Sequence, residues 1–91
     1  MRYHRMPPAE PRPTDKPIFL DALDKLLLAG ADARRPPNNN DQIKVTADLS
    51  FYPNTGTIYR DGDSKPLPFR GVDALIEYLR EIGALTAFVA P

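Results

Sequence analysis

Residues 43–69 read IKVTADLSFYPNTGTIYRDGDSKPLPF, and their pattern predicts the sheet on which the rest of the chain is built. Between Ile43 and Tyr52, apolar and polar residues alternate. The apolar row comprises Ile43, Val45, Ala47, Leu49 and Phe51, and the polar row comprises Lys44, Thr46, Asp48, Ser50 and Tyr52. Because successive side chains of a strand point to opposite faces, this alternation predicts one strand with a buried face and an open face.

Two shorter strands are expected to follow. Pro53-Asn54-Thr55-Gly56 is typical of a turn, and residues 57–60 read as a second strand. Asp61-Gly62 then predicts a type I′ hairpin turn, which needs positive φ at both central residues. Residues 65–69 would form the third strand, an edge strand because Pro66 and Pro68 lack the backbone donor that a ladder needs.

Two helices flank this region. Helical spacing of apolar residues predicts one helix over residues 17–29, with Thr14 or Asp15 as its N-cap, and another over residues 72–82. Gly30 and Gly83 suit the position just after each helix. The expected core stripe of the first helix is Phe19, Leu23, Leu26 and Leu27, and that of the second is Val72, Leu75, Ile76, Leu79 and Ile82.

This order of elements predicts an α+β fold, a two-layer α-β-β-β-α sandwich. A three-stranded antiparallel sheet would carry both helices on its one apolar face. Residues 1–13, which are rich in proline and arginine, are expected to be a disordered basic arm, and residues 14–91 a single domain. Residues 84–91 would add an edge strand, pack as a tail or reach a neighbouring subunit, and the sequence does not separate these alternatives.

The composition points to a soluble, cytoplasmic protein. Twelve basic and twelve acidic residues cancel, and the chain contains no cysteine. The absence of cysteine excludes disulfides and thiolate metal sites, and fits a reducing compartment. Neither a signal peptide nor a membrane span is expected. A domain of this size has a small core, so completion by a partner is also expected.

Catalytic chemistry is not indicated by any pattern in the chain. The only histidine, His4, falls in the predicted arm, and the turn at residues 53–56 lacks the glycine spacing and the lysine of a phosphate-binding loop. Asp61-Gly62-Asp63 lacks the further oxygen ligands of a calcium loop. We therefore expect a protein that is not an enzyme and that has neither a metal nor another cofactor.

Binding of DNA or RNA is the first function that the sequence favours. Lys44 and Tyr52 would lie on the open face, with Tyr59, Arg60 and Arg70 on the second strand and at the entry to the second helix. Aromatic rings beside basic residues provide base stacking and phosphate contacts. Arg34 and Arg35, in the loop over residues 31–41, would add a basic pair or would simply be solvated.

A protein partner or a homodimer is the alternative. A short sheet with an exposed edge, an exposed Leu28 and an apolar C-terminal end suit strand addition or self-association. The chain would then act as an adaptor or a small regulator.

Two short segments also carry a resemblance. Phe51-Tyr52-Pro53-Asn54-Thr55-Gly56-Thr57 followed by Phe69-Arg70-Gly71-Val72-Asp73-Ala74-Leu75 resembles small bacterial proteins of phage and mobile-element type. The similarity covers roughly residues 43 to 80. It implies a phage or plasmid context, and it brings no activity with it.

Overall fold

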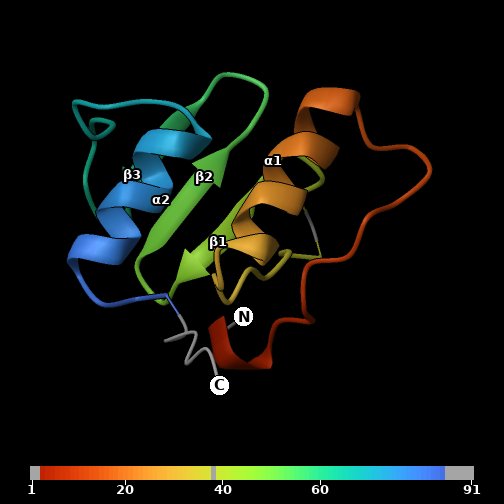
Figure 1. Cartoon of the computed structure of the whole chain (residues 1–91), viewed down its shortest axis with the longest axis horizontal. Coiled ribbons are helices and arrows are strands. Elements are labelled where there is room, and N and C mark those ends of the chain that lie inside the picture. The colour runs from red at the N-terminus through yellow and green to blue at the C-terminus, as the bar shows by residue number, and fades with distance from the viewer. Residues whose placement is uncertain (1–2, 38, 86–91) are drawn as a thin grey trace.

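The computed structural model describes residues 3–37 and 39–85 and has an α+β fold. Its elements, in chain order, are the 3₁₀ turn η1 (Tyr3–Arg5), α1 (Pro17–Leu28), β1 (Ile43–Thr46), β2 (Leu49–Tyr52), β3 (Thr57–Arg60) and α2 (Val72–Glu81). The strands form an antiparallel sheet in the order β1-β2-β3. Both helices lie on the same face of this sheet (Figure 1). The predicted fold class is therefore confirmed.

The strand predicted from Ile43 to Tyr52 is in fact a hairpin. The chain turns at Ala47 and Asp48, so that β1 and β2 pair with each other. Thr46 Oγ1 donates to Asp48 Oδ1 over 2.8 Å, and Thr and Asp side chains commonly close turns in this way. Period-two alternation does not reveal this turn because Ile43 pairs with Phe51, and both numbers are odd. The apolar row therefore stays on one face on both sides of the turn.

The third predicted strand, residues 65–69, is not a strand. Leu67 N donates to Ile58 O over 2.8 Å, but no ladder follows. Gly62 does have a positive φ of 92°, but among the described residues only glycines have a positive φ. Asp61 therefore lacks the positive φ of a type I′ turn. Three strands form because the first predicted strand divides in two.

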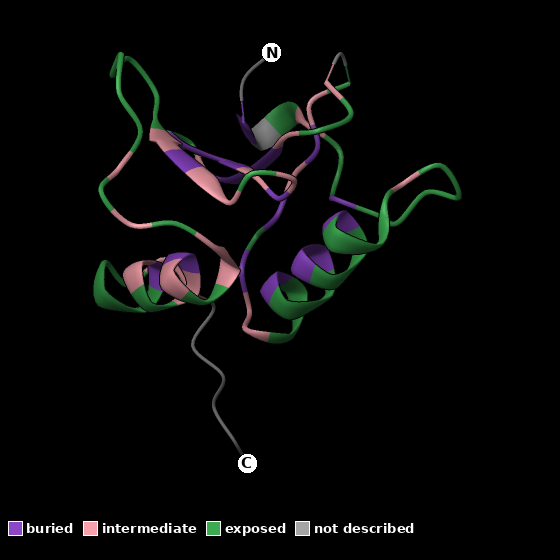
Figure 2. Cartoon of the chain, turned by 90° about the horizontal axis from the view of Figure 1, so that it is seen from above, coloured by how far each residue is buried: buried purple, intermediate pink, exposed green. Residues whose placement is uncertain are grey.

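The core lies between the helices and the sheet. Buried residues gather on the helix surfaces that face the strands (Figure 2). They include Phe19, Leu23, Leu26, Ile43, Val45, Leu49, Phe51, Ile58, Leu75 and Leu79. Five residues that were predicted to face the core are not among them. Ala47 lies in the exposed turn, Leu27 and Ile82 are 45% and 49% exposed, and Val72 and Ile76 are only partly buried. Leu28 is 80% exposed, as expected.

The ends of the helices agree with the sequence pattern except at the start of α1. Pro17 takes the first helical position, where its missing donor is harmless. The N-cap, however, is Lys16, which makes no side-chain capping bond. Thr14 or Asp15 was expected there, but the N-cap is neither, and the Asp15 carboxylate binds Arg35.

The N-terminal segment is packed against the fold over its described part, so the prediction of a disordered arm is wrong for residues 3–13. Tyr3 and Ala9 are buried, and Ala9 N donates to Ala33 O over 2.9 Å. The Tyr3 hydroxyl donates to the Asp32 carbonyl. Burial, and after it the charge of Asp32, raises the pKa of Tyr3 to about 12. Local composition missed these contacts because all of them are with the loop after α1.

Both outer edges of the sheet have neighbours. Arg34 exchanges two backbone hydrogen bonds with Lys44 of β1, of 2.7 and 2.8 Å. Beside β3, Ile58 O accepts the bond from Leu67 N. The exposed edge invoked for strand addition is therefore blocked at Lys44 and partly covered at β3.

No helix within the described residues is long and apolar enough to cross a membrane. Of the C-terminal segment, Ala31 pairs with Leu85 in an isolated antiparallel bridge. The alternatives for residues 86–91 lie outside the described part of the chain.

Candidate functional site

The face of the sheet that is turned away from the helices carries most of the predicted contact residues. Its position follows from the register, in which Lys44 pairs with Ser50 and Ser50 with Tyr59, while Tyr52 pairs with Thr57. Paired residues of neighbouring strands point to the same side. These five residues therefore share one surface, which we call the polar face.

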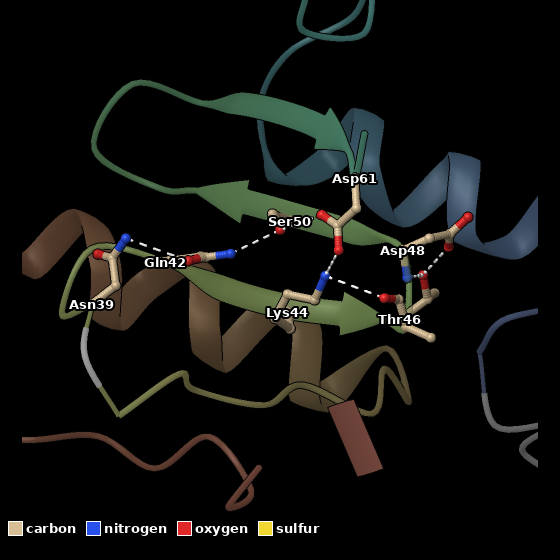
Figure 3. A network of polar contacts seen from close by, with 8 residues as sticks. Asn39, Gln42, Lys44, Thr46, Asp48, Ser50 and Asp61 are labelled. Carbon is tan, nitrogen blue, oxygen red and sulfur yellow. Dashed lines mark hydrogen bonds and ion pairs between the residues drawn. The ribbon is translucent and has the colours of Figure 1, made fainter. Parts of the chain in front are cut away.

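A chain of hydrogen bonds crosses the polar face (Figure 3). Asn39 Nδ2 donates to Gln42 Oε1 over 3.3 Å, and Gln42 Nε2 donates to Ser50 Oγ over 2.8 Å. Ser50 Oγ in turn donates to Asp61 Oδ1 over 3.1 Å. The other oxygen of Asp61, Oδ2, binds the Lys44 ammonium group. The network ties the loop before β1 to the residue that follows β3.

Lys44 was expected on an open surface, and this is wrong. Its side chain is only 5% exposed, and its ammonium group binds Asp61 and the Ala47 carbonyl. Ser50 is buried as well. The physical reason is the hairpin, since folding residues 43–52 back on themselves brings polar side chains together that one long strand would have kept apart. Lys44 is therefore unavailable to a phosphate.

A shallow depression of about 800 Å³ lies over this face. We call it the tyrosine depression. The residues around it that matter here are Asp41, Ser50, Tyr52, Tyr59, Asp61 and Asp63. The rings of Tyr52 and Tyr59 meet edge to face, with centroids 5.8 Å apart and planes at 90°. Burial, followed by the negative charge of Asp61, raises the pKa of Tyr52 above its usual value.

The loop arginines are also not the free basic pair that the sequence suggested. Arg35 is 1% exposed and holds Asp15 through two hydrogen bonds of 2.7 and 2.8 Å. Its guanidinium lies 4.3 Å from the centre of the Phe19 ring. Arg34 pairs with Asp32 through two hydrogen bonds of 2.9 and 3.2 Å. Both arginines connect the loop to the N-terminal segment, where Arg35 binds the Glu10 carbonyl and Arg34 that of Met6.

Arg60 and Arg70 remain exposed, but neither reaches across the polar face. Arg60 pairs with Leu49, which puts its side chain on the helix face, and its guanidinium donates to the Tyr78 hydroxyl over 2.5 Å. Arg70 donates to the Thr55 carbonyl over 2.7 Å, at the hairpin between β2 and β3. Of the residues predicted to bind nucleic acid, Tyr52, Tyr59 and Arg60 line the depression.

Sequence reasoning missed the residue that organises the site, Asp61. The Asp-Gly pair was interpreted as turn chemistry alone, and nothing in its spacing points to Lys44, which lies 17 positions away. Ser50 was treated simply as one of the solvated residues. The alternation did place Ser50, Tyr52 and Lys44 on one face, which is the part of the signal that was available.

Within residues 3–37 and 39–85, no three histidine, cysteine, aspartate or glutamate side chains gather closely enough to hold a metal ion. Comparison of the chain with protein-family models, with curated proteins and with solved structures finds no match. The resemblance of residues 43–80 to phage and mobile-element proteins therefore stays a prediction.

Proposed function

We propose that this chain is a small binding module, that its contact surface is the tyrosine depression and that its partner is a protein. The apolar side chains on the helix face of the sheet are buried in the core, so that face is not available to a partner. The polar face instead offers a depression with two partly exposed tyrosines. Tyrosine combines a large apolar ring with a polar tip and is enriched in protein interfaces.

The observation that carries the proposal is the fate of the basic residues. Lys44, Arg34 and Arg35 each bind a carboxylate of the same chain. The exposed charges around the depression are mostly carboxylates, those of Asp41, Asp61 and Asp63. Arg60 also lines the depression, but its guanidinium donates to the Tyr78 hydroxyl. A phosphate backbone is drawn to free cations and repelled by such carboxylates. A protein partner fits this surface better than a nucleic acid.

A site-specific photo-crosslinker tests the proposal. Thr57 lies at the depression, and Asp24 lies on the exposed side of α1 and serves as the matched control. We expect benzoylphenylalanine at position 57 to give one protein adduct that mass spectrometry identifies. The adduct should form again with the purified partner and disappear when Tyr59→Ala is added. Equal adducts from positions 57 and 24, or no adduct at 57, would count against the proposal.

Nucleic-acid binding is the second candidate, and one observation favours it. Arg60 and Arg70 are exposed and donate to neutral oxygens, those of Tyr78 and Thr55. Arg60 is the last residue of β3, and Arg70 binds the hairpin that precedes this strand. The same strands carry a pair of tyrosines that suits base stacking. Labelled DNA and RNA titrated over a range of salt concentrations test this candidate, because phosphate contacts weaken steeply as salt rises. Weak binding that Arg60→Glu leaves unchanged would exclude it.

The remaining expectations stand as parts of the proposal. A cytoplasmic location rests on the lack of cysteine, and a phage or plasmid context on the resemblance alone. Action without catalysis rests on the lack of a recognisable catalytic pattern in the sequence. Self-association is an outcome of the crosslinking test, since a second copy of this chain would be identified as the adduct.

A further inference from the structure

The two tyrosines of the depression are arranged in a way that leaves ring surface available to a ligand. Tyr52 and Tyr59 lie diagonally on neighbouring strands, since Tyr52 pairs with Thr57 and Tyr59 with Ser50. Their rings are perpendicular and their centroids lie 5.8 Å apart. In an edge-to-face pair, the two rings do not cover each other's faces as they would in a stack. Both residues are partly exposed at the depression.

Most of the charged residues that line the depression are acidic. The side chain of Asp61 is 47% exposed, and Asp41 and Asp63 are exposed as well. Lys44 forms an ion pair with Asp61, so Asp41 and Asp63 are the acidic residues there that have no ion pair within the described residues. Arg60 also lines the depression. Lys44 is covered at the floor, and the guanidinium of Arg60 is turned to Tyr78 on the other side of the sheet.

An electron-rich ring face beside a carboxylate is a combination that recognises a cation carried on an organic group. The carboxylate supplies the charge and the ring supplies the attraction to a weakly hydrated cation. At about 800 Å³, the depression is far larger than a bare ion needs and has room for a side chain with the backbone that carries it. Arginine and lysine are the cationic side chains that a protein partner offers.

We propose that the tyrosine depression binds an arginine or lysine side chain of the partner, with its cation between the Tyr52–Tyr59 ring pair and the carboxylates of Asp61 and Asp63. This inference rests on the proposed function, because it names the part of a protein partner that would enter the site. The partner segment that enters the depression would therefore be basic. It also gives the acidic rim a role in selecting the partner, since a segment carrying carboxylates would be repelled.

Short peptides test the inference on the full chain. The ¹⁵N-labelled protein is titrated with blocked tripeptides Gly-Arg-Gly and Gly-Lys-Gly. The uncharged analogues, with citrulline in place of arginine and norleucine in place of lysine, serve as matched controls. We expect the charged peptides to shift the backbone amide signals of Tyr52, Tyr59 and Gly62, and the uncharged ones to leave them unchanged. High salt should weaken the binding of the charged peptides.

Four variants locate the contact. Asp63→Lys reverses an exposed charge and should weaken the arginine peptide by about fivefold or more. Asp24→Lys makes the same change of net charge on α1 and should leave the affinity as it is. Tyr59→Phe keeps the ring and should bind like the parent chain, whereas Tyr59→Ala should not bind. If Tyr59→Ala does not fold, Asp63→Lys against Asp24→Lys decides alone.

The inference is overturned if the uncharged peptides shift the same amide signals as strongly, or if no peptide shifts them at millimolar concentration. It is likewise overturned if Asp63→Lys and Asp24→Lys weaken binding equally. Its failure is distinguishable from failure of the proposed function. If the peptides do not bind but the adduct at position 57 still forms, only the binding of a cationic side chain is rejected. If the peptides do not bind and no adduct forms, the protein-binding function is rejected as well.

Discussion

Lys44 is the residue whose environment differs most from the expectation, since its side chain is nearly buried in an ion pair with Asp61. In Lys44→Glu, a second carboxylate would face Asp61 at a position that is almost fully buried. We expect the substitution to lower the free energy of unfolding by roughly 3 kcal/mol, near the lower end for broken buried pairs because Asp61 is half exposed. Lys44→Met keeps the aliphatic stem and should lose only about 1 kcal/mol.

Urea unfolding measures both variants, and Arg60→Glu is the control for the change of charge. Arg60 is exposed, so its replacement should change the free energy of unfolding by less than about 1 kcal/mol. If Lys44→Glu were as stable as Arg60→Glu, the burial of Lys44 would be wrong.

The buried pair between Asp15 and Arg35 predicts how stability depends on pH. The hydrogen bond from Arg35 is the main cause that holds the pKa of Asp15 below its usual value. Since the pKa is lower in the folded state, the pair stabilises the fold above the pKa of unfolded Asp15. That stabilisation is lost as the pH falls through the folded value. The free energy of unfolding should therefore decrease on acidification below about pH 5, and less so in Asp15→Asn.

Urea unfolding at a series of acidic pH values checks this prediction. Asp24→Asn removes an exposed carboxylate of α1 and should keep the pH dependence of the parent chain. If the free energy of unfolding falls as steeply with pH in Asp15→Asn as in the parent chain, the pair does not contribute to the loss of stability in acid.

Substitutions at two glycines with positive φ distinguish the cost of backbone strain from the cost of steric crowding. Gly56 has a φ of 75°, and a Cβ there would lie 3.2 Å from the backbone nitrogen of Gly71, which donates to Gly56 O. Gly62 has a φ of 92°, and a Cβ there would meet nothing within 4 Å. Thermal unfolding should show Gly62→Ala destabilised by about 1 kcal/mol, from strain alone, and Gly56→Ala by about 2–3 kcal/mol. Equal losses would mean that the hairpin does not approach the start of α2 so closely.

At the scale of the elements, the inner face of α2 is the feature most directly open to test. Leu79 is fully buried, so Leu79→Ala should lower the free energy of unfolding by about 2–5 kcal/mol. Leu27 of α1 is 45% exposed, and Leu27→Ala should cost less than about 1 kcal/mol. Chemical denaturation compares the two. An unchanged stability of Leu79→Ala would mean that α2 is rotated or undocked.

The helices could be predicted closely because their signals are local. Spacing of apolar residues gave α2 within one residue of its observed end, and Gly30 and Gly83 both follow their helices with positive φ. The turn at Ala47 and Asp48 could not be predicted. When a hairpin pairs odd-numbered with odd-numbered residues, its alternation is the same as that of one long strand. Leu27 was misplaced because it lies at the margin of the α1 stripe, where the path of the neighbouring chain decides exposure.

Across the whole molecule, the ion pairs that remove charged side chains from the surface join distant segments. Lys44 meets Asp61, and Asp15 meets Arg35, across 17 and 20 positions of sequence. Charged residues in loops look alike in a sequence whether they are solvated or paired. The sequence therefore predicted which residues share the polar face, but not which of them remain available to a ligand. The packing of the N-terminal segment was missed for the same reason.

The β1–β2 hairpin is the feature on which the burial of Lys44 and the tyrosine depression both depend. Nuclear Overhauser effects between backbone protons measure its register directly. The structure predicts cross-strand contacts between Ile43 and Phe51 and between Lys44 and Ser50. A spectrum with only sequential contacts over residues 43–52, as one uninterrupted strand would give, would contradict the hairpin and with it the proposed binding surface.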